Sequence, residues 1–412
     1  MINAVSAFGF GFATGGAVIV ANLYGRGEIK EARRNAGVVL ILTAIISIFL
    51  ILLTILGVIP LLKALNFNRG IIERGQVYFY IQITTTALTA INVVFIGLER
   101  AKRNIKLIIM MNIVVALIKV ILTLLFVFVF SLNSIEWIAV TTLIAQLSLT
   151  IFAITVMFNK NNIFKIDLKD LSFNKKYIKE MIKISIPVVL GRFTFSFGKV
   201  IVNYLATVYY GAGAIAALSI TYKANLGVGV ISSSSEEVET TLISQNLGNK
   251  NPKRAFKTVS VATIYTMIFT ILGAVLIALL MEPAVKFFIS KPTEVTASAM
   301  EEYYLKIETA KELLKFEILS ILANALTNVL LGGFYGFKLT KISYIVNIVR
   351  LFIFRIPILI LLYYFASDIG YKVVGLTMAL SNIFTAILLG VFFLIFYFKN
   401  KANNFIHYLE VA

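Results

Sequence analysis

Three carboxylates stand close together in a segment that is otherwise uncharged. Glu236, Glu237 and Glu239 follow the serine run 232–235 and precede a turn at Gly248. Glu236 and Glu239 share one face of a helix, because they are three residues apart, and Glu237 points about 100° away. Carboxylates held together in an apolar setting do not all stay ionised, which favours binding of a proton or a metal cation. The triplet is therefore a predicted ion-coupling site; the alternative is a hydrated position near the membrane surface.

Six cations also lie within apolar segments. They are Lys119, Arg192, Lys199, Lys223, Arg350 and Arg355. A cation inside a membrane pairs with a carboxylate, contacts an anionic substrate, or extends its side chain to the interface. We treat all six as candidates for the wall of a polar cavity, with extension to the interface as the alternative for Arg192, which follows Pro187 near a helix start.

The composition predicts the elements that must position these charges. Of the 412 residues, 59% are hydrophobic and 14% are charged, whereas soluble domains have about 45–50% and about 25%. Segments of about 20 apolar residues span a bilayer. Eleven are found, near 1–23, 35–59, 77–98, 105–130, 134–158, 184–209, 213–246, 255–281, 312–336, 343–365 and 371–397. No alternating pattern of the barrel type recurs, so we expect an all-α integral membrane protein of about eleven transmembrane helices.

The residue types that many enzymes need are scarce. The chain has no cysteine and one histidine, His407, which lies in the polar tail. Thiolate nucleophiles and thiol-ligated metals are thereby excluded, and a histidine-based metal centre is disfavoured. We expect a protein that is not an enzyme and that has no cofactor and no bound metal, apart from Na⁺ or H⁺ as a coupling ion.

The positive charge is distributed unequally between the two sides of the predicted membrane. Lys and Arg number 23 on one set of connections and the tail, against nine on the alternate connections. By the positive-inside rule the basic side is cytoplasmic. We therefore expect a multi-pass protein of the inner (plasma) membrane with a cytoplasmic C-terminus. The net charge of +18 then reflects topology rather than nucleic-acid binding.

A glycine turn occurs twice at a fixed spacing of 223 residues. The matched pairs are Gly25 with Gly248, Ala32 with Ala255, Pro60 with Pro283, and Lys63 with Lys286. Such duplications are common in transporters, where the binding site lies near the membrane midplane between the repeats. The predicted organisation is an N-terminal lobe of five helices over 1–158, a lysine-rich amphipathic connector over 159–183, a C-terminal lobe of six helices over 184–397, and a tail over 398–412.

The motifs together resemble those of the multidrug and toxin extrusion (MATE) family. The resemblance rests on NLYGRGEIKEARR, QNLGNKNPKRA, GLERAKRN and GFKLTKIS, and on the Pro187 helix that leads into GAGAIAALSI. It implies two six-helix lobes, and secondary active export of amphipathic, often cationic, small molecules by sodium or proton antiport with alternating access. The family's first helix has no counterpart, so we expect that the chain starts inside a longer protein or is truncated.

The resemblance also bears on the ion-coupling residues. Two positions that are acidic in some family members correspond to Asn203 and Asn324. Both are kept as candidates for ion coupling or substrate binding, and the glutamate triplet is proposed as a substitute on physical grounds alone.

Two other functions remain open at this stage. One is a flippase for lipid-linked saccharides of the same superfamily, for which the six cations would form a basic cavity that holds pyrophosphate. The other is a truncated remnant that does not transport. Carboxylates on the cavity wall favour cationic drugs, and a basic wall favours anionic lipids. In each case the expected partners are a small molecule and the lipid bilayer, without nucleic acid, and we expect a monomer.

Overall fold

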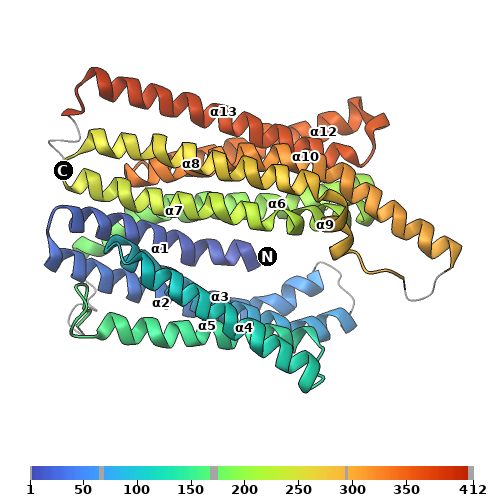
Figure 1. Cartoon of the computed structure of the whole chain (residues 1–412), viewed down its shortest axis with the longest axis horizontal. Helices are drawn as coiled ribbons and strands as arrows, with labels where there is room; N and C mark the ends of the chain where they lie inside the picture. Colours follow the sequence, from blue (N-terminus) through green and yellow to red (C-terminus); the bar gives the residue numbers. More distant parts are fainter. Residues whose placement is uncertain (1, 65–68, 168–174, 293–295, 407–412) are drawn as a thin grey trace. The chain divides into compact units, whose positions relative to one another are not determined.

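The structure is a computed structural model that describes residues 2–64, 69–167, 175–292 and 296–406; within these ranges it is helical and contains no strand. The helices are α1 (Ile2–Gly25), α2 (Ile29–Ala64), α3 (Arg69–Ala101), α4 (Ile105–Leu124), α5 (Ile135–Phe158), α6 (Lys175–Ala224), α7 (Leu226–Gly248), α8 (Pro252–Leu279), α9 (Met281–Phe288), α10 (Ala297–Gly336), α11 (Lys341–Ile348), α12 (Ile356–Phe365) and α13 (Lys372–Ala402) (Figure 1). Two π-helices, η1 (Leu125–Val129) and η2 (Val349–Arg355), and a 3₁₀ turn, η3 (Ser367–Ile369), complete the order.

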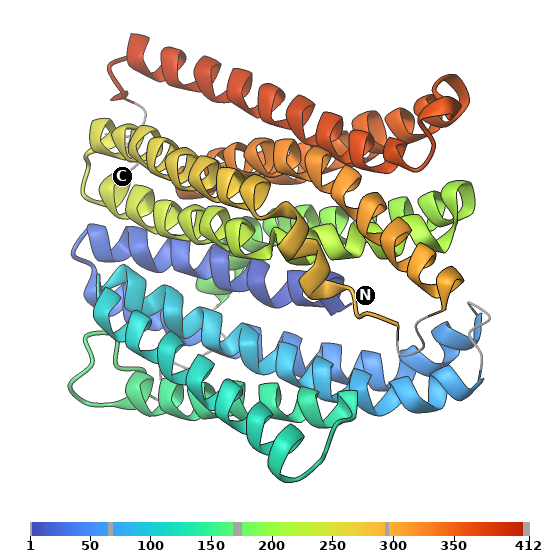
Figure 2. The same ribbon diagram turned by 45° about the vertical axis from the view of Figure 1, so that its right-hand side comes forward.

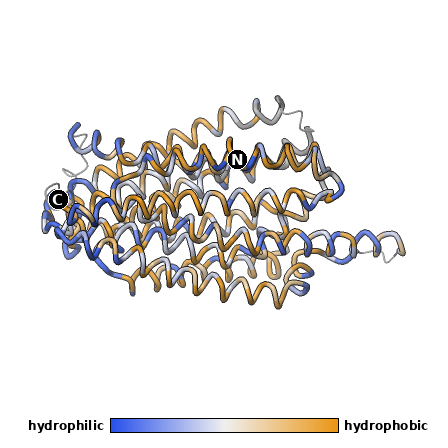
Figure 3. The backbone as a smooth tube through the Cα atoms, turned by 90° about the horizontal axis from the view of Figure 1, so that it is seen from above, coloured by the Kyte–Doolittle hydropathy of each residue, from blue (hydrophilic) through white to orange (hydrophobic). Residues whose placement is uncertain are grey.

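The predicted all-α membrane fold is confirmed. Within the described residues, ten helical segments are long and apolar enough to cross a membrane. The predicted span 213–246 is the one that is not among the ten. It is divided between the end of α6 and the polar helix α7, and α6 itself bends at Gly211, whose φ is +80°. Figure 3 shows apolar residues along most of the length of the helices and hydrophilic residues gathered at the turns near the label of the C-terminus.

The chain forms two compact units. Unit 1 comprises Met1–Phe193 and Ser244–Lys250, and unit 2 comprises Thr194–Ile243 and Asn251–Ala412. Most of α7 thus belongs to unit 2 and its end belongs to unit 1. Of the predicted connector 159–183, residues 175–183 form the start of α6, and residues 168–174 lie outside the described part, as does His407.

Unit 1 packs α1 closely against its neighbours by means of small residues. A Cβ atom added at Gly9 would lie 2.4 Å from the Cβ atom of Ala90 on α3, and one added at Gly16 would lie 2.4 Å from Val39 on α2. Small residues let helix backbones approach in a membrane, where dispersion and not water exclusion drives packing. In unit 2, α8, α10 and α13 run side by side (Figures 1 and 2), around buried residues such as Leu313.

The spacing of 223 residues also holds for the backbone of the turns. Gly27, after α1, has φ +78°, and Lys250, after α7, has φ +53°. Both occupy the left-handed region that terminates a helix at its C′ position. The next helices begin at Ile29 and at Pro252, again 223 residues apart. The matched glycines, Gly25 and Gly248, each precede these turns.

The two matched glycines contact each other's helices within unit 1. A Cβ atom at Gly25 would lie 2.3 Å from the carbonyl oxygen of Gln245, and one at Gly248 would lie 2.1 Å from that of Asn22. Asn22 and Gln245 are themselves 223 residues apart. In addition, the Nδ2 atom of Asn22 donates a hydrogen bond to the carbonyl oxygen of Ser244 at 3.1 Å. The contacts are therefore reciprocal, and both positions require glycine because backbone atoms occupy the space of a side chain.

Candidate functional site

Unit 2 buries a group of charged side chains from three helical segments. Lys199 lies on α6, Glu317 on α10, and Arg350 and Arg355 on η2. Each arginine exposes 3% of its surface and Glu317 exposes 8%. We call these four residues the charged cluster. Burial of charges is costly unless each charge finds polar partners, so the contacts of the cluster decide what it can do.

The π-helix places the two arginines on one face. In an α-helix, residues five apart point about 140° away from each other. A π-helix bonds residue i to residue i+5 and so brings such residues nearly above one another. Arg350 and Arg355 are five apart within η2, and both side chains reach the same acceptor, the Oδ1 atom of Asn382 on α13.

Neutral oxygens accept most of the hydrogen bonds of the two guanidinium groups. Arg350 donates from Nε to the Oδ1 atom of Asn382 at 3.0 Å and from an NH2 group to the Oδ1 atom of Asn324 at 2.9 Å. Arg355 donates from NH2 to the same Asn382 oxygen at 2.8 Å and from Nε to the Oγ atom of Ser381 at 3.1 Å. The Nδ2 atom of Asn382 in turn donates to Ser320 at 2.6 Å. These bonds fix the positions of both arginines.

The ring of Phe195 joins the three cations. The Cζ atom of Arg350 lies 4.3 Å from the centre of this ring, that of Arg355 lies 5.8 Å from it, and the Nζ atom of Lys199 lies 4.6 Å from it. Lys199 also lies 5.6 Å from the ring centre of Tyr222. An aromatic face attracts cations, more strongly where they are removed from water. Phe195 thus holds positive charges together that would otherwise repel each other.

The charged cluster carries an excess of positive charge. The charges that act on Glu317 are those of Lys199, Arg355 and Arg350. Among the described residues, none of these three cations forms a direct ion pair with a carboxylate. Three cations therefore surround one acid, and the amide and hydroxyl oxygens that bind the arginines supply hydrogen-bond acceptors but no compensating charge. An arrangement of this kind can bind an anionic group.

The predicted glutamate triplet forms a second, separate site in unit 2. Glu239 exposes 1% of its surface, Glu236 exposes 7%, and Glu237 is half-buried. The charge that acts on Glu239 is that of Glu236, and no cation of the charged cluster is involved. Helix α7 packs here against α10, where the hydroxyl of Thr240 donates to the carbonyl oxygen of Gly332 at 3.1 Å. The prediction that Glu236 and Glu239 share a face is in keeping with this burial.

The other predicted residues occupy different settings. Lys119 and Lys223 are exposed, and Arg192 is half-buried in unit 1. Asn203 is half-buried on α6, and its side-chain oxygen has no hydrogen-bond partner in the described part of the chain. Asn324 contacts Arg350, so of the seven candidates Lys119, Arg192, Lys199, Lys223, Arg350, Arg355 and Asn324 the structure gathers four.

The matched prolines stand in the membrane-spanning helix α2 and in the short helix α9. Pro60 lies inside α2, and Pro283 is the third residue of α9, so both lie in helices and not in turns. Both are exposed.

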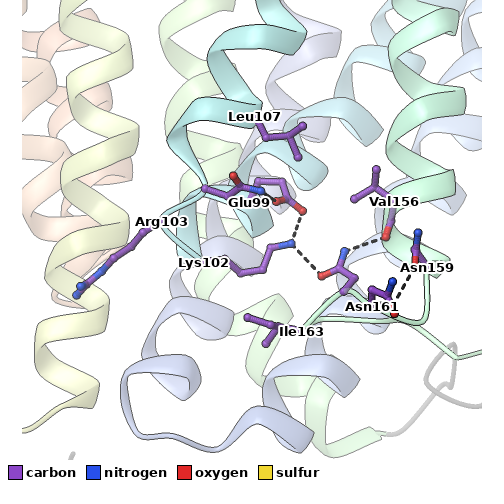
Figure 4. Close-up of a pocket in the computed structure, with 10 residues that line it drawn as sticks. Glu99, Lys102, Arg103, Leu107, Val156, Asn159, Asn161 and Ile163 are labelled. Carbon is purple, nitrogen blue, oxygen red and sulfur yellow. Dashed lines mark hydrogen bonds and ion pairs between the residues drawn. The ribbon is translucent and has the colours of Figure 1, made fainter.

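The polar contacts of unit 1 are different in kind. Asn92 on α3 donates to the Oε1 atom of Gln146 on α5 at 2.9 Å and accepts from the hydroxyl of Thr150 at 2.9 Å. At the end of α3, a cavity of about 500 Å³ is lined by polar side chains (Figure 4). There Lys102 pairs with Glu99 and donates to Asn162 at 2.9 Å. Each charge in this cavity wall that faces inward thus has an opposite partner.

Sequence reasoning missed Glu317 and Asn382. Glu317 is an isolated acid within the predicted span 312–336, and the rule that selected the triplet, that acids inside a membrane are costly and functional, selects it equally. Asn382 is a neutral amide among many and gives no such signal. Its role depends on the position of α13 against η2, which the sequence pattern does not state.

Comparisons with known proteins agree with this architecture. The sequence profile described as MatE matches residues 1–125 and 187–361. No curated protein matches the chain. The fold is similar to that of a multidrug resistance MATE family transporter of the MOP superfamily in its outward-facing conformation, with a TM-score of 0.82, 16% identity, and coverage of 95% of this chain and 84% of that one.

Two further solved structures are similar. A MOP superfamily transporter from Pyrococcus furiosus has a TM-score of 0.84 at 16% identity, with 95% of this chain and 84% of that chain covered. A mutant of the MATE transporter VcmN from Vibrio cholerae has a TM-score of 0.78 at 17% identity, with 97% and 86% covered. Because the profile match extends over most of the sequence and the helical fold agrees with it, the chain belongs to the MATE family of multi-pass membrane transporters, which act on small molecules and are not enzymes.

Proposed function

We propose that this transporter moves small amphipathic molecules across the membrane by alternating access and that it binds an anionic group of its cargo in the charged cluster. One observation carries the proposal: three buried cations, Lys199, Arg350 and Arg355, surround the single carboxylate of Glu317. A carboxylate, sulfonate or phosphate group of the cargo would balance the remaining charge. An apolar body attached to that group would suit a site enclosed by membrane-spanning helices.

The geometry of the arginines favours an anion over a purely structural role. A structural arginine inside a protein is usually neutralised by a carboxylate, because an uncompensated buried charge is costly. Arg350 and Arg355 instead share one amide oxygen, that of Asn382. Two planar forks that are held by neutral acceptors are oriented in advance of binding, which reduces the entropy lost on binding the cargo.

A similar structure supports a basic pocket. The MOP superfamily transporter from Pyrococcus furiosus is described by a reverse polarity of its binding pocket that suggests a different function. The same contrast applies to the present chain, for which the sequence predicted cationic cargo. That prediction remains, and the flippase for lipid-linked saccharides remains as well, since its pyrophosphate group is one of the anions that the charged cluster would accept.

The energy source and the orientation belong to the same proposal. An inward gradient of sodium or protons would drive export from a monomer in the plasma membrane, with the C-terminus in the cytoplasm. The excess of lysine and arginine on one set of connections supports this orientation.

The test uses purified protein in proteoliposomes with three probes of different charge. Radiolabelled taurocholate is an amphipathic anion, ethidium is an amphipathic cation, and farnesyl pyrophosphate is a short lipid pyrophosphate that serves as a competitor. We expect gradient-driven transport of taurocholate and inhibition by farnesyl pyrophosphate. Transport of ethidium without taurocholate would overturn the anionic assignment and restore the cationic one. Absence of transport of either probe under both gradients would contradict the proposed function.

Matched variants locate the site. In the double variant Arg350→Gln and Arg355→Gln, we expect a fall in taurocholate transport of about ten- to hundredfold, because charge-assisted hydrogen bonds contribute about 1.5–3 kcal/mol each. The control is the double variant Lys119→Gln and Lys223→Gln, which removes two exposed cations and should leave transport unchanged. An equal loss in both double variants would show that net charge, and not the charged cluster, determines transport.

A further inference from the structure

Glu239 is a buried acid that the anion site does not use. It exposes 1% of its surface, and neither of its carboxylate oxygens has a hydrogen-bond partner within the described residues. Nine residues separate it from the end of α7 at Gly248, which corresponds to roughly 13 Å along a helix. The alternative of a hydrated position near the membrane surface therefore does not hold for this residue.

The surroundings of Glu239 are apolar. A Cβ atom added at Gly333 on α10 would lie 3.5 Å from the Oε1 atom of Glu239, 3.5 Å from Val259 on α8 and 3.6 Å from Phe393 on α13. These side chains thus meet around Gly333. An ionised carboxylate in such a place would have lost its hydration without any compensation, so the neutral acid is the form that fits.

The charged groups nearby do not offer a counter-ion. On α7 itself, Glu236 is an acid and Glu237 lies on a different face. The basic residues of α8, Lys253, Arg254 and Lys257, are exposed at its start. On α10 and α13 the ionisable residues that are nearest in sequence to Gly333 and Phe393 are Lys338 and Lys399. A metal cation would need several oxygen ligands, whereas the neighbours here are a glycine, a valine and a phenylalanine.

We propose that Glu239 carries a coupling proton: it holds the proton as a carboxylic acid while α7 is packed on α10, and it releases the proton to water when the two helices separate. The step is a simple ionisation, in which the carboxylic acid gives a carboxylate and a proton. This inference rests on the proposed transport function and names the ion and the residue for it.

The contact that must open is defined by three glycines of α10. A Cβ atom at Gly332 would lie 2.7 Å from the carbonyl oxygen of Glu236, and one at Gly336 would lie 2.6 Å from the Cβ atom of Ile243. Gly333 lies between them and faces the carboxyl group. The close approach that glycine permits is what excludes water from Glu239, so separation of α7 from α10 hydrates the acid and favours its ionised form.

The first experiment measures the protonation of Glu239 without transport. Infrared spectra of the full chain in lipid nanodiscs are recorded near neutral pH for the wild type, for Glu239→Gln and for Glu237→Gln. We expect the carbonyl band of a protonated carboxylic acid in the wild type, its reduction in Glu239→Gln, and no change in Glu237→Gln. An unchanged band in Glu239→Gln would overturn the assignment, whether or not any cargo is transported.

The second experiment separates coupling from cargo binding. In proteoliposomes, Glu239→Gln should abolish taurocholate uptake driven by a pH gradient but retain exchange of labelled for unlabelled taurocholate, because exchange needs no net proton movement. Arg350→Gln with Arg355→Gln should abolish both. If Glu239→Gln keeps gradient-driven uptake, or if a sodium gradient alone drives the wild type, Glu239 does not carry the coupling proton. If the wild type shows neither process, the proposed function fails while the infrared result stands.

A hydroxyl at Gly333 provides a gain-of-contact test. Gly333→Ser places a donor next to the Glu239 carboxylate, which stabilises the ionised form, and Gly333→Ala adds the same Cβ atom without the donor. Both substitutions meet ordinary van der Waals distances of 3.5–3.6 Å. We expect the pH at which uptake is half-maximal to fall in Gly333→Ser relative to Gly333→Ala. Identical pH profiles for the two variants would contradict the proposal.

Discussion

The helix that follows the left-handed turn in each unit offers a direct comparison. In unit 1, Arg103 has φ +61° and is followed by α4 and η1; in unit 2, Lys338 has φ +61° and is followed by α11, η2 and α12. Both helices are apolar, both are long enough to span a membrane, and both contain a π-helix. They nevertheless place their cations in opposite environments.

The difference lies in the position of the π-helix. In the first helix, η1 holds the residues LFVFV and carries no charge, and Lys119 on α4 is exposed. In the second helix, η2 begins and ends next to arginines that are both buried against Phe195 and Asn382. Composition therefore does not determine whether a cation inside a membrane is functional. The local helical geometry and the neutral acceptors of the neighbouring helix determine it.

Asn382→Leu should have the largest effect, because the Oδ1 atom of Asn382 accepts from both arginines. Loss of the partner of a buried charge costs about 3–5 kcal/mol. The matched control is Asn92→Leu in the neutral network of unit 1, for which we expect about 0.6–2 kcal/mol. Unfolding by titration with sodium dodecyl sulfate measures both. Equal losses would mean that charge makes no difference between the two networks.

Arg350→Lys should have the next largest effect. Lysine keeps the positive charge but cannot contact Asn324 and Asn382 together as the guanidinium does. We expect the apparent KM for taurocholate to rise about tenfold, in line with the loss of about 1.5 kcal/mol of charge-assisted hydrogen bonding, with little change in the maximal rate. A KM equal to that of the wild type would show that the planar fork is not needed.

Deletion of Ile353 should have a smaller effect and tests the π-helix itself. Ile353 is exposed, and its removal would convert η2 to α-helix, in which the two arginines become four residues apart and again share a face. We expect transport within about threefold of the wild type, since a fall of this size corresponds to well under 1 kcal/mol. A complete loss, with the protein still folded, would indicate that the π-helix contributes more than the alignment of the arginines.

Lys119→Gln should have the smallest effect. The side chain is exposed on α4, whose most apolar window contains no buried residue, so its loss removes no contact within unit 1. We expect thermal stability and taurocholate transport to remain at wild-type values. A clear loss of transport would place Lys119 on the cargo path after all and would remove the contrast between the two helices.

Much of the fold was predictable because the bilayer requires long apolar helices, and their lengths are written in the sequence. The turns at Gly27 and Lys250 followed from the same repeat. The contents of the charged cluster were only partly predictable. Lys199, Arg350 and Arg355 were identified as costly charges, but the same criterion selected Lys119, because the direction in which a helix residue points depends on neighbouring helices. Glu317 was missed although its position satisfied that criterion.

The predicted role of the triplet is sharpened in a similar way. The spacing of Glu236 and Glu239 placed them on one face, and the structure distinguishes them by burial and by the absence of hydrogen-bond partners for Glu239 in the described chain. The sequence could not make this distinction, because the space around Glu239 is shaped by Gly333, which is almost 100 residues further along the chain.

The reciprocal contact of Gly25 and Gly248 has a consequence for genetics. Each glycine leaves room for the backbone of the other turn, so a substitution at one of them displaces a helix encoded more than 200 codons away. Second-site suppressors of Gly25→Ala would then be found around Gln245, and those of Gly248→Ala around Asn22. The two turns form one unit of inheritance, although they are distant in the gene.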